Sequence, residues 1–114
     1  MRKNVIVAVA TLGEKGLQDS VSHEFGHSKT FTIIEIEEGK IKNVKVIQNP
    51  AASISHGRGP LIAKKLAEMK VQMVISGEVG PGASAILKEF GIAQEVASPG
   101  QRLENALKEK ALLG

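Results

Sequence analysis

The sequence contains no cysteine, tryptophan or tyrosine, and only three phenylalanines. Without cysteine it can form no disulfide, no thiolate-bound zinc or iron–sulfur centre and no cysteine nucleophile. The scarcity of aromatic rings argues against a surface that stacks single-stranded nucleic acid. The long apolar run nearest the start, Val5–Ala10, is too short for a signal peptide or a membrane span. We therefore expect a cytoplasmic protein with neither a membrane nor a nucleic acid as partner.

The length of 114 residues and the hydrophobic content of 42% predict one domain, residues 1–114, with a single core. The net charge of +3 has two interpretations. One is a solvated, lysine-rich surface. The other is a mild positive field that favours a small anion. Duplex nucleic acid is not indicated, because the sequence has no arginine cluster or basic stripe.

Apolar, β-branched stretches predict strands at residues 4–10, 30–37, 41–48, 71–76 and 92–97. Helical spacing of apolar residues predicts three helices. The first begins at Pro60 and has Ile62, Ala63, Leu66 and Met69 or Lys70 at helical spacing. The second, which Gly91 ends, has the apolar face Ala83, Ile86, Leu87 and Phe90. The third follows a predicted capping box, Ser98–Gln101, and buries Leu103, Ala106, Leu107 and Ala111.

The first and fourth strands are apolar on both faces, which predicts that they lie at the centre of a sheet. Right-handed crossovers then give a five-stranded mixed sheet of order 3-2-1-4-5 with strand 2 antiparallel. This is an α/β fold, the ribonuclease H-like three-layer sandwich. A flavodoxin-like sheet is the alternative, but it needs a helix directly after the first strand. The third strand carries Lys40, Lys42 and Lys45, which is typical of an exposed edge and favours a monomer.

In such a sheet, loops 11–29, 50–59 and 77–82 meet at the carboxyl ends of the parallel strands. Open α/β sheets bind ligands at that edge. Histidines, glycines and an arginine are concentrated in these loops. The candidate cofactor-binding residues are Ser22, His23, Phe25, Gly26, His27, His56, Gly57, Arg58, Gly59, Gly77, Glu78 and Gly80.

Each loop also has a structural interpretation. Phe25 can close the open end of the core while His23 and His27 are solvated. The second loop is either a flexible turn or an anion site at a helix N-terminus, with Arg58 as the clamp. The third loop serves a similar purpose to a phosphate-binding loop but matches no phosphate or dinucleotide fingerprint.

Enzyme functions have little support in the residues. A ribonuclease H-type nuclease needs carboxylates on the first strand to hold two metal ions, and Asn4–Ala10 contains none. The sequence has no Gly-x-Ser-x-Gly elbow. Three histidines with Glu24 or Glu78 could form a zinc site, although no short motif indicates one. We expect a binding protein that is not an enzyme.

Four segments together resemble the dinitrogenase iron–molybdenum cofactor biosynthesis family: residues 19–31 (DSVSHEFGHSKTF), Gln48–Pro50, His56–Pro60 and Gly77–Pro81. The resemblance spans the whole chain. It implies a ribonuclease H-like fold and binding of iron–molybdenum–sulfur cofactors or their precursors. The orange-protein-like members of sulfate reducers hold a molybdenum–copper sulfide cluster, and the small size of this chain suits that type. The family often has His-Phe-Gly-Arg where this chain has Glu24-Phe25-Gly26-His27.

The implied role is carriage of an anionic metal-sulfide cluster that contains molybdenum with iron or copper. Inorganic sulfide already fills the metal coordination, so a carrier needs backbone N–H donors, a few cations and glycine loops. The metal-ligand candidates His23, His27 and His56 could instead donate hydrogen bonds to sulfide. The alternative is a small regulatory or interaction module that binds a nucleotide or phosphate in the same cleft. The sequence identifies no donor or acceptor protein.

Overall fold

The computed structural model describes residues 4–113, so residues 1–3 and 114 of the predicted domain lie outside the described part. The strands are β1 (Asn4–Thr11), β2 (Thr30–Glu37), β3 (Lys40–Gln48), β4 (Met73–Ser76) and β5 (Ala93–Val96). The helices are α1 (Arg58–Glu68), α2 (Pro81–Glu89), α3 (Leu103–Glu109) and a short 3₁₀ helix, η1 (Gly16–Gln18).

The five strands form one sheet in the order β3-β2-β1-β4-β5, which confirms the predicted strand order. β2 runs antiparallel to β1 and β3, whereas β4 runs parallel to β1 and β5. All of β4 and most of β1 is buried, because helices cover both faces of the sheet at its centre. The name ribonuclease H-like for this arrangement stays a prediction.

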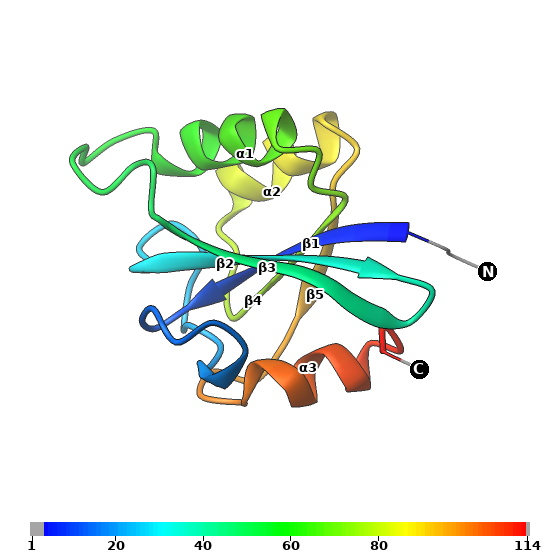
Figure 1. Cartoon of the computed structure of the whole chain (residues 1–114). Helices are drawn as coiled ribbons and strands as arrows, with labels where there is room; N and C mark the ends of the chain where they lie inside the picture. Colours follow the sequence, from blue (N-terminus) through cyan, green and yellow to red (C-terminus); the bar gives the residue numbers. More distant parts are fainter. Residues whose placement is uncertain (1–3, 114) are drawn as a thin grey trace.

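The sheet lies between two helical layers, with α1 and α2 on one face and α3 on the other (Figure 1). Alternate residues of β1 supply the two cores, because successive side chains of a strand point to opposite faces. Ala8 and Ala10 belong to the core that includes residues of α1 and α2. Val7 and Val9 belong to the core that includes residues of α3. The two apolar faces of β1 thus hold the three layers together.

All three helices begin at other residues than predicted, and α2 begins at Pro81, inside the predicted loop 77–82. α1 begins at Arg58, not at Pro60, because Gly57 takes the left-handed backbone that precedes its first turn (φ 71°). The predicted capping box at Ser98 is wrong, because Arg102 is the N-cap of α3 and no side chain caps it. The amide of Gln101 instead bonds to the Ser98 carbonyl (3.0 Å), which closes a turn around Gly100.

Two residues predicted for apolar helix faces are exposed. Phe90 follows the last residue of α2 and is 47% exposed. Ala111 has a left-handed backbone (φ 59°) beyond the end of α3, and Leu112 is buried in its place. Gly91 does follow α2 with a positive φ of 74°, as predicted. Within residues 4–113, no helix is both long and apolar enough to cross a membrane.

Candidate functional site

The three predicted loops meet in one cleft at the carboxyl ends of β1 and β4, with a volume of about 450 Å³. It lies beside the first turns of α1 and α2 and the segment that follows β1. Its lining residues are Glu24, Gly26, His27, Ser55, Gly57, Arg58, Gly59, Pro60, Glu78, Gly80, Gly82 and Ala83.

The first and third loops are joined by backbone hydrogen bonds that form one wall of the cleft. The amides of Gly77 and Glu78 donate to the carbonyls of Ser22 (3.1 Å) and His23 (2.7 Å). The Phe25 amide donates in return to the Glu78 carbonyl (2.9 Å). A Cβ on Gly77 would overlap the His23 carbonyl, so this close approach requires glycine.

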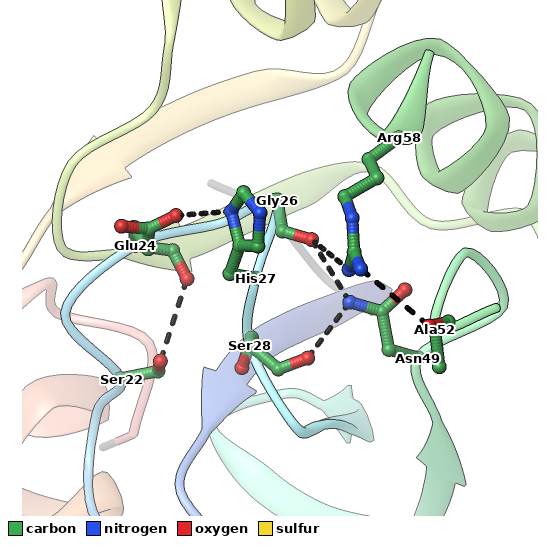
Figure 2. Close-up of polar contacts among 8 residues, drawn as sticks. All are labelled: Ser22, Glu24, Gly26, His27, Ser28, Asn49, Ala52 and Arg58. Atoms are coloured by element: carbon green, nitrogen blue, oxygen red, sulfur yellow. Dashed lines mark hydrogen bonds and ion pairs between the residues drawn. The ribbon is translucent and has the colours of Figure 1, made fainter. Parts of the chain in front are cut away.

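The first loop is also fixed to the end of β3 by the buried side chain of Asn49 (Figure 2). Its Nδ2 donates to the carbonyls of Gly26 (3.1 Å) and Ser28 (2.7 Å), while its Oδ1 accepts from the Ala51 amide (2.7 Å). These hydrogen bonds satisfy the buried side-chain amide of Asn49 and fix the first loop relative to the end of β3. Asn49 therefore positions the loop that carries Gly26 and His27.

The N-termini of α1 and α2 both line the cleft, and neither is capped by a side chain or carries an acidic residue in its first turn. Their first intrahelical bonds run from Leu61 to Gly57 (3.3 Å) and from Ser84 to Gly80 (2.9 Å). Pro60 and Pro81 have no N–H, and the amides of Gly59, Gly82 and Ala83 find no backbone acceptor among the described residues. Unpaired amides and the helix dipoles give this wall a partial positive charge.

Arg58 is the only lysine or arginine among the described residues that line the cleft. Its guanidinium reaches across to the carbonyls of Gly26 and Ala52, each at 3.4 Å (Figure 2). Both bonds are long, and the buried Nε finds no hydrogen-bond partner within residues 4–113. The two terminal nitrogens thus retain donor capacity for an anion in the cleft.

The cleft lining also includes two carboxylates. Glu24 and Glu78 lie side by side in a parallel bridge, and both line the cleft. His27 Nδ1 lies 2.6 Å from Glu24 Oε1, with both side chains exposed to solvent (Figure 2). With neutral His27, the formal charges of Arg58, Glu24 and Glu78 sum to −1. The cleft therefore holds both the partial positive charge of the helix N-termini and two negative side chains.

Residues 3–111 match the protein family described as dinitrogenase iron-molybdenum cofactor. The chain belongs to this family. The match extends over nearly the whole sequence, and it confirms the resemblance carried by the loop segments.

Two solved structures have a fold similar to that of this chain. The apo form of the orange protein from Desulfovibrio gigas is 26% identical, with a TM-score of 0.82 over 93% of this chain and 86% of that one. A Thermotoga protein of the DUF35 family is 28% identical, with a TM-score of 0.76 over 94% of this chain and 87% of that one.

A curated relative, an uncharacterised protein of Methanocaldococcus jannaschii, is 40% identical over 72 residues. These residues are 63% of this chain and 61% of the relative's length. The match therefore covers less than two-thirds of that relative.

Some predicted binding residues of this family member lie at the cleft, and others do not. The lining includes Gly26, His27, Gly57, Arg58, Gly59, Glu78 and Gly80. It does not include Ser22, His23, Phe25, His56 or Gly77. Phe25 is completely buried and packs edge-on against Phe31 with ring centroids 5.3 Å apart, so it closes the end of the core. Ser22 and Gly77 contribute backbone bonds, and the side chains of His23 and His56 are exposed.

The three histidines that are candidate metal ligands do not form a metal-binding group among the described residues. Residues 4–113 contain no group of three or more histidine, cysteine, aspartate or glutamate side chains placed to hold a metal ion. His27 pairs with Glu24, while His23 and His56 lie outside the cleft lining. Any bond from a histidine to a metal would therefore need a metal whose other ligands come with it, as sulfides do in a cluster.

Sequence reasoning missed five lining residues: Glu24, Ser55, Pro60, Gly82 and Ala83. The place of Gly82 and Ala83 in the cleft could be predicted from the sequence, because a helix that follows a glycine-rich turn presents its first amides beside the preceding loop. The sequence indicates Glu24 only as a partner of the histidines in a possible zinc site. Its place in the cleft depends on pairing with Glu78, a residue far away in the sequence.

Proposed function

We propose that the cleft binds an anionic, molybdenum-containing metal-sulfide cluster or its precursor, and that the protein carries this cargo without transforming it. The observation that carries the proposal is the convergence of two uncapped helix N-termini with Arg58 in one cleft of a chain from this family. Amide dipoles and a guanidinium are the groups that stabilise an anion in proteins.

The donor set suits a cluster that is already saturated with sulfide. Such a cargo needs hydrogen bonds and charge at its surface rather than new ligands to each metal. Thiolates would compete for soft metals and slow release, and the sequence has no cysteine. Arg58 and the amides of Gly59, Gly82 and Ala83 would face sulfide, while His27 would donate a hydrogen bond from Nε2 when its ring is protonated. No catalytic step is part of this role.

The carboxylates of the cleft constrain the cargo. Glu24 and Glu78 repel negative charge, so the sulfide-rich side would face the helix N-termini. Iron and copper both remain candidates for the second metal. The proposed setting is the cytoplasm and the proposed state a monomer, with donor and acceptor proteins still to be identified.

The experiment is anaerobic gel filtration of the purified protein with tetrathiomolybdate, alone and with Fe²⁺ or Cu⁺, followed by metal analysis of the protein peak. The proposal expects molybdenum to elute with the protein. Elution of all molybdenum in the small-molecule volume, with every added metal, would contradict it.

A nucleotide or phosphate is the second candidate, because helix N-termini with an arginine also bind phosphate. Competition separates the two. If ATP or inorganic phosphate binds at least as tightly as tetrathiomolybdate and displaces it, the regulatory function is favoured. If neither displaces it at millimolar concentration, the sulfide cargo is favoured.

A further inference from the structure

The two helix N-termini at the cleft touch each other at a position where one of them lacks a side chain. A Cβ built on Gly59 would lie 2.6 Å from the Cβ of Ala83 and 3.0 Å from its Cα. Real Cβ atoms do not approach other carbons so closely, and neither contact is with the flexible end of a long side chain. The first turn of α1 can therefore lie this close to α2 only because residue 59 is glycine.

The same missing side chain leaves an amide uncovered. The Cβ position of Gly59 is 3.3 Å from the backbone nitrogen of Ala83, in the first turn of α2. That amide has no backbone acceptor among the described residues, and both Gly59 and Ala83 line the cleft. A methyl group on Gly59 would both push the helices apart and crowd this donor.

The demand for glycine here is steric rather than conformational. Gly57 needs its left-handed backbone, and a Cβ on it would meet nothing within 4 Å. Gly59 is the second residue of α1, and it is not one of the glycines with a positive φ. Its backbone conformation would therefore accept alanine, and the close contact with Ala83 is what requires glycine.

We propose that Gly59 is a positioning residue that brings the N-termini of α1 and α2 close enough to act as one anion-binding surface. One anionic group of the ligand then contacts amides of both helices, together with Arg58. This inference rests on the proposed function and identifies which contact sets the affinity and the size of the anion. A wider gap between the helices favours a larger anion over a smaller one.

The test compares tetrathiomolybdate and the smaller molybdate ion as probes, with dissociation constants for the wild type and Gly59→Ala. We expect Gly59→Ala to weaken tetrathiomolybdate binding about tenfold, as for loss of one hydrogen bond to a charged group. Molybdate should be weakened by a larger factor, because the smaller ion cannot bridge a wider gap. An equal loss of affinity for both ions, or no loss of affinity for either, would overturn the inference.

Rescue separates positioning from a general loss of structure. Gly59→Ala with Ala83→Gly removes the Cβ that the new methyl meets, so binding should recover at least partly. The matched control combines Gly59→Ala with Ala85→Gly, because Ala85 is an exposed residue of α2 outside the cleft lining. Recovery with Ala85→Gly, or none with Ala83→Gly, would contradict the proposed contact. Should Gly59→Ala not fold, Ala83→Val enlarges the other side of the contact and serves in its place.

Failure of the proposed function has a different result. If the wild type binds neither tetrathiomolybdate nor molybdate, no cargo of this class is carried. The spacing itself is then measured by NMR, from proton contacts between residues 59 and 83. Gly59→Ala should lose or lengthen contacts between the helix backbones. Unchanged backbone contacts would overturn the positioning role whatever the ligand.

Discussion

Glu24 and Glu78, which are 54 positions apart in the sequence, lie side by side in a parallel bridge and present two carboxylates to one cleft. The bridge is held by the backbone bonds of Phe25 and Glu78, so the positions of both acids are fixed by the same contact that joins the loops. A cleft lined by both helix N-termini and carboxylates orients its ligand by charge.

Removing either carboxylate charge tests whether the cargo is anionic. Glu78→Gln and Glu24→Gln should each strengthen tetrathiomolybdate binding about threefold, the effect of removing one like charge several ångströms away in a solvated site. Glu68→Gln is the control, because Glu68 is an exposed residue of α1 outside the cleft lining. Weaker binding in both cleft variants would mean that the carboxylates bond a metal of the cargo.

Arg58 should supply the largest single side-chain contribution to binding. Arg58→Ala should weaken it by about 1.5–3 kcal/mol, the range for hydrogen bonds to charged groups. Lys64→Ala removes the same charge from the exposed face of α1 and should have little effect. Added salt should weaken the wild type more than Arg58→Ala, because only the wild type keeps this charge pair. Titration followed by absorbance at two salt concentrations measures both effects, and equal affinity of Arg58→Ala and wild type would remove Arg58 from the site.

His27 should act as a hydrogen-bond donor rather than a metal ligand. If its Nδ1–H donates to Glu24, the neutral ring offers only a lone pair at Nε2, and protonation adds a donor there. Cluster retention should therefore hold or rise as the pH falls from about 8 to about 6, the interval in which histidines commonly gain a proton. His27→Asn keeps a donor and should retain most of the binding.

The measurement is retention on gel filtration across that pH range, with free cluster at each pH as the control for its decomposition. His23→Asn and His56→Asn are matched substitutions outside the cleft lining and should behave as wild type. Acid-induced release together with loss of the cluster in His27→Asn would show direct ligation.

Much of the fold could be predicted because its determinants are local or follow from handedness. The apolar runs at β1 and β4 identify buried strands, and right-handed crossovers then fix the sheet order and the edge at which the loops meet. For Phe25 the sequence allows both a binding role and closure of the core, since loop residues have no period that separates inward from outward, and the structure shows closure. The segment that begins at Ser98 forms a turn rather than the predicted helix start, because the Gly100 amide donates a hydrogen bond to the Val21 carbonyl (2.8 Å). The capping motif alone does not reveal this long-range contact.

The junction between the first and third loops should be sensitive to one added methyl group. Gly77→Ala places a Cβ against the carbonyls of His23 and Ser22, both backbone atoms that cannot rotate away. The variant should lose about 1–3 kcal/mol of unfolding free energy, the usual cost of overpacking. Gly80→Ala is the control, because a Cβ there meets nothing within 4 Å. Urea denaturation gives both values, and equal stability of the two variants would contradict the junction.

The most direct test of the central claim is the molybdenum content of the protein peak after anaerobic reconstitution with tetrathiomolybdate and Fe²⁺ or Cu⁺, for wild type and Arg58→Ala in parallel. We predict that molybdenum elutes with the wild type in a constant ratio to protein and that the ratio falls sharply in Arg58→Ala. A wild type that elutes without molybdenum, or an Arg58→Ala variant that carries as much as the wild type, would contradict cluster binding in this cleft.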